Sequence, residues 1–138
     1  MNSEKTVFIV NPRAGGGVAG RRWSLVRNMA EERLRSFATC FTSEAGDATR
    51  IARQQLLSGA DLIISVGGDG TVNEVINGFM DGEAPIRKEA RLGIMPYGTG
   101  CDLARTILAS SSPDRALKAI EDGHIRYMDS WPGTIYGS

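Results

Sequence analysis

The sequence predicts an α/β fold in which the strands of a mostly parallel sheet alternate with helices. Short apolar runs rich in β-branched residues are separated by segments whose apolar residues recur with a helical period. Such alternation is typical of right-handed βαβ units. Three of the four clearest runs end in loops rich in glycine and proline, at the edge where parallel sheets bind ligands. With 138 residues, the chain is long enough for one such domain.

Two strands and two helices are expected in the first half of the chain. The strands are residues 6–10, ended by proline and glycine in residues 11–17, and residues 37–42. One helix is expected over residues 19–35, and a second begins near residues 46–47. The apolar stripes of the two helices are Trp23, Val26, Ala30 and Leu34, and then Ile51, Ala52 and Leu56.

The alternation continues in the second half with strands at residues 62–66 and 92–95. A glycine-rich joint, residues 67–70, follows the third strand and opens a helix. The apolar stripe of that helix is Val72, Val75, Ile76 and Phe79. The loop after the fourth strand, residues 96–100, leads into a further helix.

The last part of the chain contains one more strong helix signal. Ser112 and Pro113 are typical of a helix start, and Gly123 ends that helix. Residues 125–131 are expected to begin another strand, and the residues after them offer no obvious closing element.

Charge and cysteine content narrow the class of protein. Lys and Arg number 16 and Asp and Glu number 16, so no basic excess indicates a nucleic acid partner. Cys40, Cys101 and the single His124 have no metal-like spacing, which favours a reduced, intracellular chain. The start lacks the pattern of a signal peptide, and no apolar run approaches the ~20 residues of a membrane span. We therefore expect a cytoplasmic location.

Three other side chains that could take part in chemistry have structural interpretations. Cys40 is expected to be a small core residue, and His124 a helix cap or a surface residue. Cys101 lies at an expected helix start, where a thiol pKa can fall, but no histidine is near it in the sequence. None of the three is assigned a catalytic role.

The glycine joint after the third strand carries the main chemical signal. Gly67, Gly68 and Gly70 permit positive φ and leave no Cβ between the backbone N–H groups and a ligand. Amides at a strand-to-helix joint, together with the helix dipole, make a phosphate site. Asp69 suits such a site if Mg²⁺ accompanies the phosphates, or if it holds a ligand hydroxyl or a neighbouring amide. The pattern matches neither the Walker loop nor GxGxxG.

A purely structural interpretation covers part of the same segment. Thr71 and Glu74 have the spacing of a capping box, and Thr99 and Asp102 could cap the next helix in the same way. Capping does not account for the three glycines around Asp69, and a capping threonine can also contact a ligand.

Taken together, three segments resemble the catalytic domain of diacylglycerol kinases, sphingosine kinases and related bacterial lipid kinases. They are Asn-Pro-Arg-Ala-Gly at 11–15, Gly-Gly-Asp-Gly-Thr-Val-Asn-Glu-Val at 67–75 and Leu-Gly-Ile-Met-Pro-Tyr-Gly-Thr-Gly-Cys-Asp-Leu-Ala-Arg at 92–105. They occur in the family's order and spacing. The Gly-Gly-Asp-Gly-Thr core also occurs in NAD kinases. The resemblance implies a Rossmann-like, three-layer, mostly parallel sheet of the NAD kinase and diacylglycerol kinase superfamily.

The same resemblance implies an activity, cofactors and site residues. The activity is transfer of the γ-phosphoryl group of ATP to a lipid hydroxyl such as that of diacylglycerol, with Mg²⁺ as cofactor. Asp69 is the candidate catalytic residue, near the metal or orienting the acceptor hydroxyl, and no residue is assigned as a metal ligand. The implied nucleotide contacts are Asn11, Pro12, Arg13, Ala14, Gly15, Thr42, Gly67, Gly68, Asp69, Gly70, Thr71, Val72, Asn73, Glu74 and Thr99.

Two departures from the family pattern shape the remaining expectations. The family usually has asparagine at the position of Cys101, and its members are longer, with a second, β-rich domain that supplies the catalytic base and much of the lipid pocket. Residues 1–138 are therefore expected to be the N-terminal ATP-binding α/β subdomain, inactive alone. The alternatives are a NAD kinase-like enzyme and a non-catalytic nucleotide-binding module. A homodimer and a transient association with the inner face of the membrane are left open.

Overall fold

The computed structural model describes residues 5–14, 16–34, 36–82, 84–96, 125–126 and 134–136. Within these residues, one sheet has the strand order β2-β1-β3-β6-β8-β7, and β4 and β5 form a separate hairpin. The strands are β1 (Thr6–Val10), β2 (Ala38–Phe41), β3 (Leu62–Gly67), β4 (Met80–Asp81), β5 (Ala84–Pro85), β6 (Arg91–Pro96), β7 (Ile125–Arg126) and β8 (Thr134–Tyr136). The helices are α1 (Val18–Arg33), α2 (Asp47–Leu57) and α3 (Asp69–Phe79).

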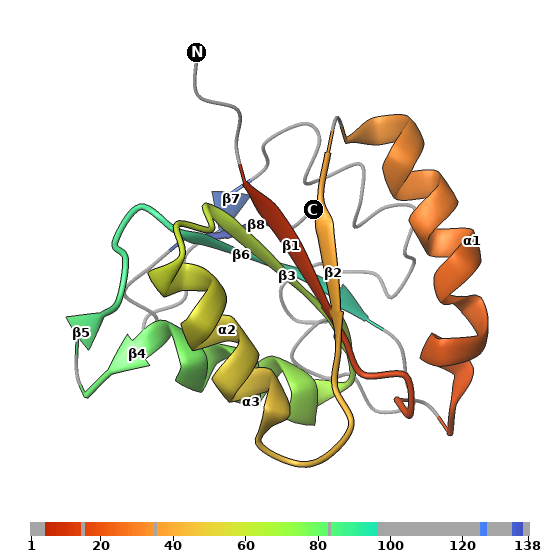
Figure 1. Cartoon of the computed structure of the whole chain (residues 1–138), viewed down its shortest axis with the longest axis horizontal. Helices are drawn as coiled ribbons and strands as arrows, with labels where there is room; N and C mark the ends of the chain where they lie inside the picture. Colours follow the sequence, from red (N-terminus) through yellow and green to blue (C-terminus); the bar gives the residue numbers. More distant parts are fainter. Residues whose placement is uncertain are drawn as a thin grey trace.

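The four strands expected from the apolar runs all pair in parallel, so the predicted α/β fold is confirmed. β1 lies between β2 and β3, and β6 continues the sheet on the far side of β3. Helix α1 covers one face of this sheet, and α2 and α3 lie together over the other face (Figure 1). The carboxyl ends of β1, β2, β3 and β6 therefore lie along one edge of the sheet.

The core is centred on β1, whose four apolar residues are completely buried. Side chains alternate between the faces of a strand. Phe8 accordingly meets Trp23 of α1, with ring centroids 5.3 Å apart. The buried Val7 and Ile9 belong to the opposite face of the sheet, over which α2 and α3 lie. Three residues of the expected stripe on α1, Trp23, Val26 and Ala30, are buried, while Leu34 follows the helix and is half-buried.

Helices α2 and α3 cross with almost no space between their backbones. A Cβ at Gly78 would lie 2.6 Å from both the Cβ of Ala52 and the backbone oxygen of Thr49. The hydroxyl of Thr49 also donates a hydrogen bond of 2.7 Å to the backbone oxygen of Glu74. The two helices thus form one rigid unit, and the start of α2 is held beside the first turns of α3.

Several details differ from the sequence-based expectations. Helix α1 ends at Arg33, because Leu34 already has an extended backbone. The β4–β5 hairpin, where Gly82 has a φ of 67°, carried no recognised signal. The expectation of no closing element after residue 131 is wrong, since β8 pairs in parallel with β6.

The strand expected to start at residue 125 begins with β7, which is antiparallel to β8; the rest of the expected range, residues 127–131, lies outside the described residues. The helices expected between residues 101 and 123 lie outside the described residues. In the part of the chain that is described, none of the helices combines the length and apolar character needed to cross a bilayer.

Candidate functional site

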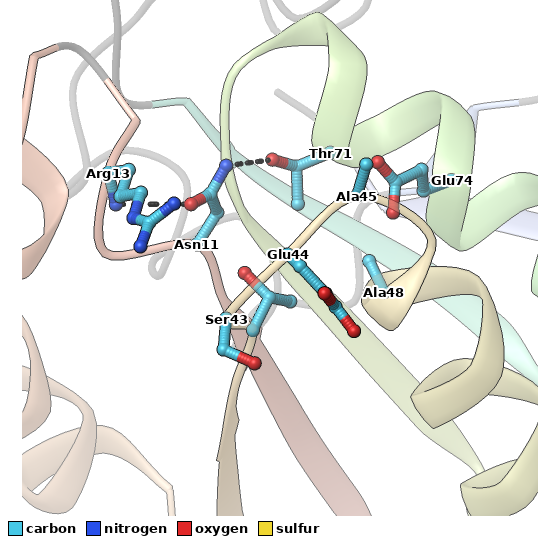
Figure 2. Close-up of a pocket in the computed structure, with 9 residues that line it drawn as sticks. Asn11, Arg13, Ser43, Glu44, Ala45, Ala48, Thr71 and Glu74 are labelled. Carbon is cyan, nitrogen blue, oxygen red and sulfur yellow. Dashed lines mark hydrogen bonds between the residues drawn. The ribbon is translucent and has the colours of Figure 1, made fainter.

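A pocket lies at the carboxyl edge of the sheet, where the loops after β1 and β2 meet the first turns of α3 (Figure 2). Its volume is about 240 Å³. The pocket is lined by Asn11, Arg13, Thr42, Ser43, Glu44, Ala45, Ala48, Thr71 and Glu74. Five of the predicted nucleotide contacts are thereby brought together: Asn11, Arg13, Thr42, Thr71 and Glu74.

Asn11 connects the loop after β1 to both β3 and α3. Its backbone N–H donates to the oxygen of Val66 at 2.9 Å and so extends the pairing of β1 and β3 by one bond. Its side-chain oxygen accepts the N–H of Arg13 at 3.0 Å, and its side-chain nitrogen donates to Oγ1 of Thr71 at 3.3 Å. This asparagine therefore sets the position of Arg13 relative to α3, and Figure 2 shows both bonds.

The loop after β2 is shaped by Asp47, the first residue of α2. One oxygen of its carboxylate, Oδ2, accepts the backbone N–H of Ser43 at 2.8 Å, the hydroxyl of Ser43 at 2.8 Å and the N–H of Glu44 at 3.1 Å. These bonds, the first from the Ser43 backbone, lower the pKa of Asp47 to about 2. Asp47 is 8% exposed and stays ionised at neutral pH, so the loop is folded around a fixed negative charge.

Glu74 caps a neighbouring helix. Its Oε1 accepts the N–H of Gly46, the residue that precedes α2, at 2.9 Å. The capping box expected for Thr71 and Glu74 is wrong, because α3 starts at Asp69 and Thr71 already lies inside the helix. The hydroxyl of Thr71 instead accepts the bond from Asn11. Both side chains thus join separate elements around the pocket.

The glycines of the joint at residues 67–70 are explained by packing and open space rather than by positive φ. Among the described residues, positive φ occurs at five other glycines and not at Gly67, Gly68 or Gly70, so the expectation of left-handed backbone is wrong. Gly67 is required by packing, since a Cβ there would lie 2.5 Å from Oγ1 of Thr71. Gly70 is exposed, and a Cβ there would have nothing within 4 Å. The joint therefore combines one closely packed glycine with one that leaves open space at the helix start.

The remaining predicted contacts take different positions. Asp69 is half-buried in the first turn of α3 and lies outside the pocket lining, while Asn73 is exposed. Val72 is completely buried, so its side chain belongs to the core. Ala14 is buried as well, and the backbone oxygen of Pro12 accepts the N–H of Gly20 in α1. The predicted contacts Gly15 and Thr99 lie outside the described residues.

Sequence reasoning missed the part of the pocket that follows β2, namely Ser43, Glu44, Ala45 and Ala48. These residues carry no recognised motif. The signal that could have found them is positional, because the second strand of a parallel sheet ends beside the first and third.

The pocket has different charges at its two ends. The guanidinium of Arg13 lies beyond Asn11, and the carboxylate of Glu74 lies beside Ala45 on the opposite side (Figure 2). Glu44 adds a second carboxylate to the lining. Anionic groups of a ligand are therefore favoured near Arg13 and the start of α3. Hydroxyl or amino groups are favoured near the two glutamates.

Comparison with known proteins shows the family to which the chain is related. The family model described as "Diacylglycerol kinase catalytic domain" matches residues 5–131. A diacylglycerol kinase of Bacillus subtilis (strain 168) is 39% identical over 100 residues, which are 72% of this chain and 32% of that protein. A diacylglycerol kinase of Staphylococcus saprophyticus is 36% identical over 122 residues, which are 88% of this chain and 39% of that protein.

The fold is shared with solved structures of the same kind. The crystal structure of a diacylglycerol kinase from Bacillus anthracis str. Sterne superposes with a TM-score of 0.75 at 33% identity. That match covers 91% of this chain and 44% of the other. The matched parts of this chain span 32% and 39% of the length of these two curated relatives. The resemblance read from the three sequence motifs is confirmed, and the chain belongs to the diacylglycerol kinase catalytic domain family.

Proposed function

We propose that this chain is the ATP-binding part of a lipid kinase that transfers the γ-phosphoryl group to a lipid hydroxyl such as that of diacylglycerol. The observation that carries the proposal is the meeting of three elements at one pocket: the loop after β1, the loop after β2 and the start of α3. This is the edge at which parallel α/β sheets hold nucleotides. Family membership supplies the reaction class.

The charges of the pocket orient the nucleotide. Its phosphates lie at the start of α3, where the helix dipole favours anions and Gly70 leaves room for close approach to the backbone. The guanidinium of Arg13 adds a positive charge on that side. The nucleoside extends toward α2, where the carboxylate of Glu44 can accept a ribose hydroxyl and Ala45 and Ala48 offer apolar contact.

Mg²⁺ fits this site through Asp69. The ion is usually held by one or two carboxylates together with substrate phosphates, and Asp69 is the carboxylate in the first turn of α3. The described residues contain no group of three or more carboxylate, cysteine or histidine side chains that could hold a metal by themselves. When bound, Mg²⁺ would neutralise charge on the transferred phosphoryl group. The chain's own share is to hold the phosphates at fixed amides and to place Asp69 beside them.

A labelling experiment with the whole protein tests the proposal. The protein is incubated with γ-labelled ATP and Mg²⁺ in three separate reactions, with diacylglycerol vesicles, with a mixed lipid extract and with NAD. Label in a phospholipid product supports the proposal. Label in the dinucleotide alone would indicate the NAD kinase alternative, and ATP binding without transfer to any acceptor would indicate a non-catalytic module.

A further inference from the structure

We infer that Asp47 is a positioning residue for the nucleotide, because it fixes the segment of residues 43–46 as one wall of the pocket. This inference rests on the proposed ATP binding and adds a residue that carries no part of the motifs in the loop after β1 or at the start of α3. Asp47 is outside the pocket lining itself, so its effect on a ligand is exerted through its neighbours.

The first support is the number of bonds that converge on one carboxylate oxygen. Oδ2 of Asp47 accepts three hydrogen bonds, two from Ser43 and one from Glu44, at 2.8 to 3.1 Å. Bonds to an ionised acceptor are stronger than bonds between neutral groups. The carboxylate is nearly enclosed, so water cannot easily replace these donors. Ser43 and Glu44 are therefore held at fixed positions relative to α2.

The second support is an independent anchor at the other end of the same segment. Glu74 reaches from α3 to accept the N–H of Gly46 at 2.9 Å. Residues 43, 44 and 46 are thus tied to two carboxylates from two helices. Since those helices are themselves closely packed at Gly78, the segment cannot shift as a unit.

The third support is that two polar side chains of the pocket wall can still bind a ligand. The N–H of Glu44 is used by Asp47, while its side-chain carboxylate has no partner among the described residues and lines the pocket. The hydroxyl of Thr42 likewise has no partner in the described part of the chain. Asp47 therefore holds the chain so that the carboxylate of Glu44 and the hydroxyl of Thr42 can bind a nucleoside. Its own carboxylate is already hydrogen-bonded within the protein.

Asp61 provides a matched control at the opposite edge of the sheet. Its Oδ2 also accepts a backbone N–H, from Lys5 at 2.8 Å, and its Oδ1 pairs with Arg87 at 3.1 Å. Removing either aspartate therefore releases a backbone segment from a carboxylate anchor. The two sites differ in that the segment held by Asp47 lines the pocket and the segment held by Asp61 does not.

The experiment measures Mg·ATP affinity by calorimetry and the KM for ATP and for diacylglycerol, in the whole protein. Asp47→Ala should raise the Kd and the KM for ATP about tenfold, with the KM for the lipid unchanged. Asp47→Asn retains an acceptor oxygen and should recover part of that loss. Asp61→Ala should lower the thermal midpoint while leaving the affinity for ATP within about twofold.

The outcomes that would overturn the inference differ from the one that would overturn the proposed function. An ATP affinity for Asp47→Ala within about twofold of the wild type would overturn the inference, as would an equal loss in Asp61→Ala. If Asp47→Ala does not fold, Asp47→Asn and Ser43→Ala, which removes only the hydroxyl donor, take its place and should weaken ATP binding about threefold. Failure of the wild type to bind Mg·ATP would instead overturn the proposed function.

Discussion

The two edges of the sheet contain similar interactions, but only the carboxyl edge has the candidate pocket beside them. At each edge an aspartate accepts a backbone N–H from a residue that lies next to a strand. Asp47 accepts from Ser43, which follows β2, and Asp61 accepts from Lys5, which precedes β1. At each edge an arginine contacts that aspartate, Arg50 at 3.4 Å and Arg87 at 3.1 Å. Yet the pocket lies only beside the first of these two aspartates.

The difference lies in which polar groups are already paired. At the amino edge, Arg87 donates to the oxygen of Ala60 at 2.7 Å and to Asp61, while the side chain of Lys5 donates to Ser58. These groups satisfy one another and hold the chain together. At the carboxyl edge, the side chains of Arg13 and Glu44 have no partner among the described residues, although both line the pocket. An edge becomes a site when its backbone is anchored and some of its charges are left for a ligand.

The largest expected effect is on turnover, at the start of α3. Asp69→Asn in the whole protein should lower kcat about 100-fold or more while the protein remains folded, because it removes the carboxylate proposed to meet the metal and the phosphates. Steady-state kinetics with circular dichroism checks both parts. Asp81→Asn, an exposed carboxylate in β4, is the control. A kcat within a few-fold of the wild type would reduce Asp69 to a residue of the first helical turn.

A pair of glycine substitutions separates packing from ligand approach within the same joint. Gly67→Ala should lower the free energy of unfolding by ~1–3 kcal/mol, since the new Cβ would press on Thr71. Gly70→Ala should leave that free energy unchanged or raise it by up to ~1 kcal/mol, because alanine is the better helix former. Its new methyl group should nevertheless weaken ATP binding about tenfold.

Urea unfolding and calorimetry on both variants provide the measurement for this pair. Unchanged ATP affinity in Gly70→Ala would mean that phosphates do not approach the backbone at that residue. Wild-type stability in Gly67→Ala would mean that Thr71 can move aside, and with it the bond from Asn11.

The sequence was sufficient for features that depend on neighbouring residues. The run from Thr6 to Val10 is a strand as expected, because its apolar, β-branched residues and the proline and glycine after it act locally. The strand β8, by contrast, is stabilised by pairing with β6. A segment of three residues is too short to show the alternation of apolar and polar residues that marks a strand. Elements of that length can be recognised only from the sheet that receives them.

The site was only partly predictable for a related reason. Thr71 and Glu74 have a spacing that satisfies a local capping rule, yet their side chains bond to Asn11 and Gly46, 60 and 28 residues away in the chain. The spacing alone cannot distinguish these partners from local ones. The role of Asp47 was hidden because its bonds run backward into a loop without a motif. The sequence motifs point to Asn11, Thr71 and Glu74, but they give no sign of the bonds by which Asp47 holds Ser43 and Glu44.

A smaller effect is expected on acid stability at the carboxyl edge. The pKa of Asp47 is lowered to about 2 in the folded protein by the bonds from Ser43 and Glu44, compared with an ordinary value of 3.8. Its contribution to stability should be fully present above about pH 4 and disappear as the pH falls toward about 2. Urea unfolding across this range should show a shallower pH dependence for Asp47→Asn than for the wild type. Ser43→Ala should raise the pKa of Asp47, and parallel curves for all three proteins would contradict the assignment.

The smallest effect is expected at the amino edge, and it tests whether the two edges are independent. Arg87→Met retains the apolar stem but loses the bonds to the oxygen of Ala60 and to Asp61, so the free energy of unfolding should fall by ~1–2 kcal/mol. Because neither Arg87 nor its partners Ala60 and Asp61 line the pocket, the affinity for Mg·ATP should stay within about twofold of the wild type. Calorimetry and urea unfolding of the same preparation measure both quantities, and Asp61→Asn combined with Arg87→Met should cost less than the sum of the single changes. A clear loss of ATP affinity in Arg87→Met would show that strain at one end of β3 reaches the other. The pocket would then depend on the whole length of the sheet rather than on the anchors at its own edge.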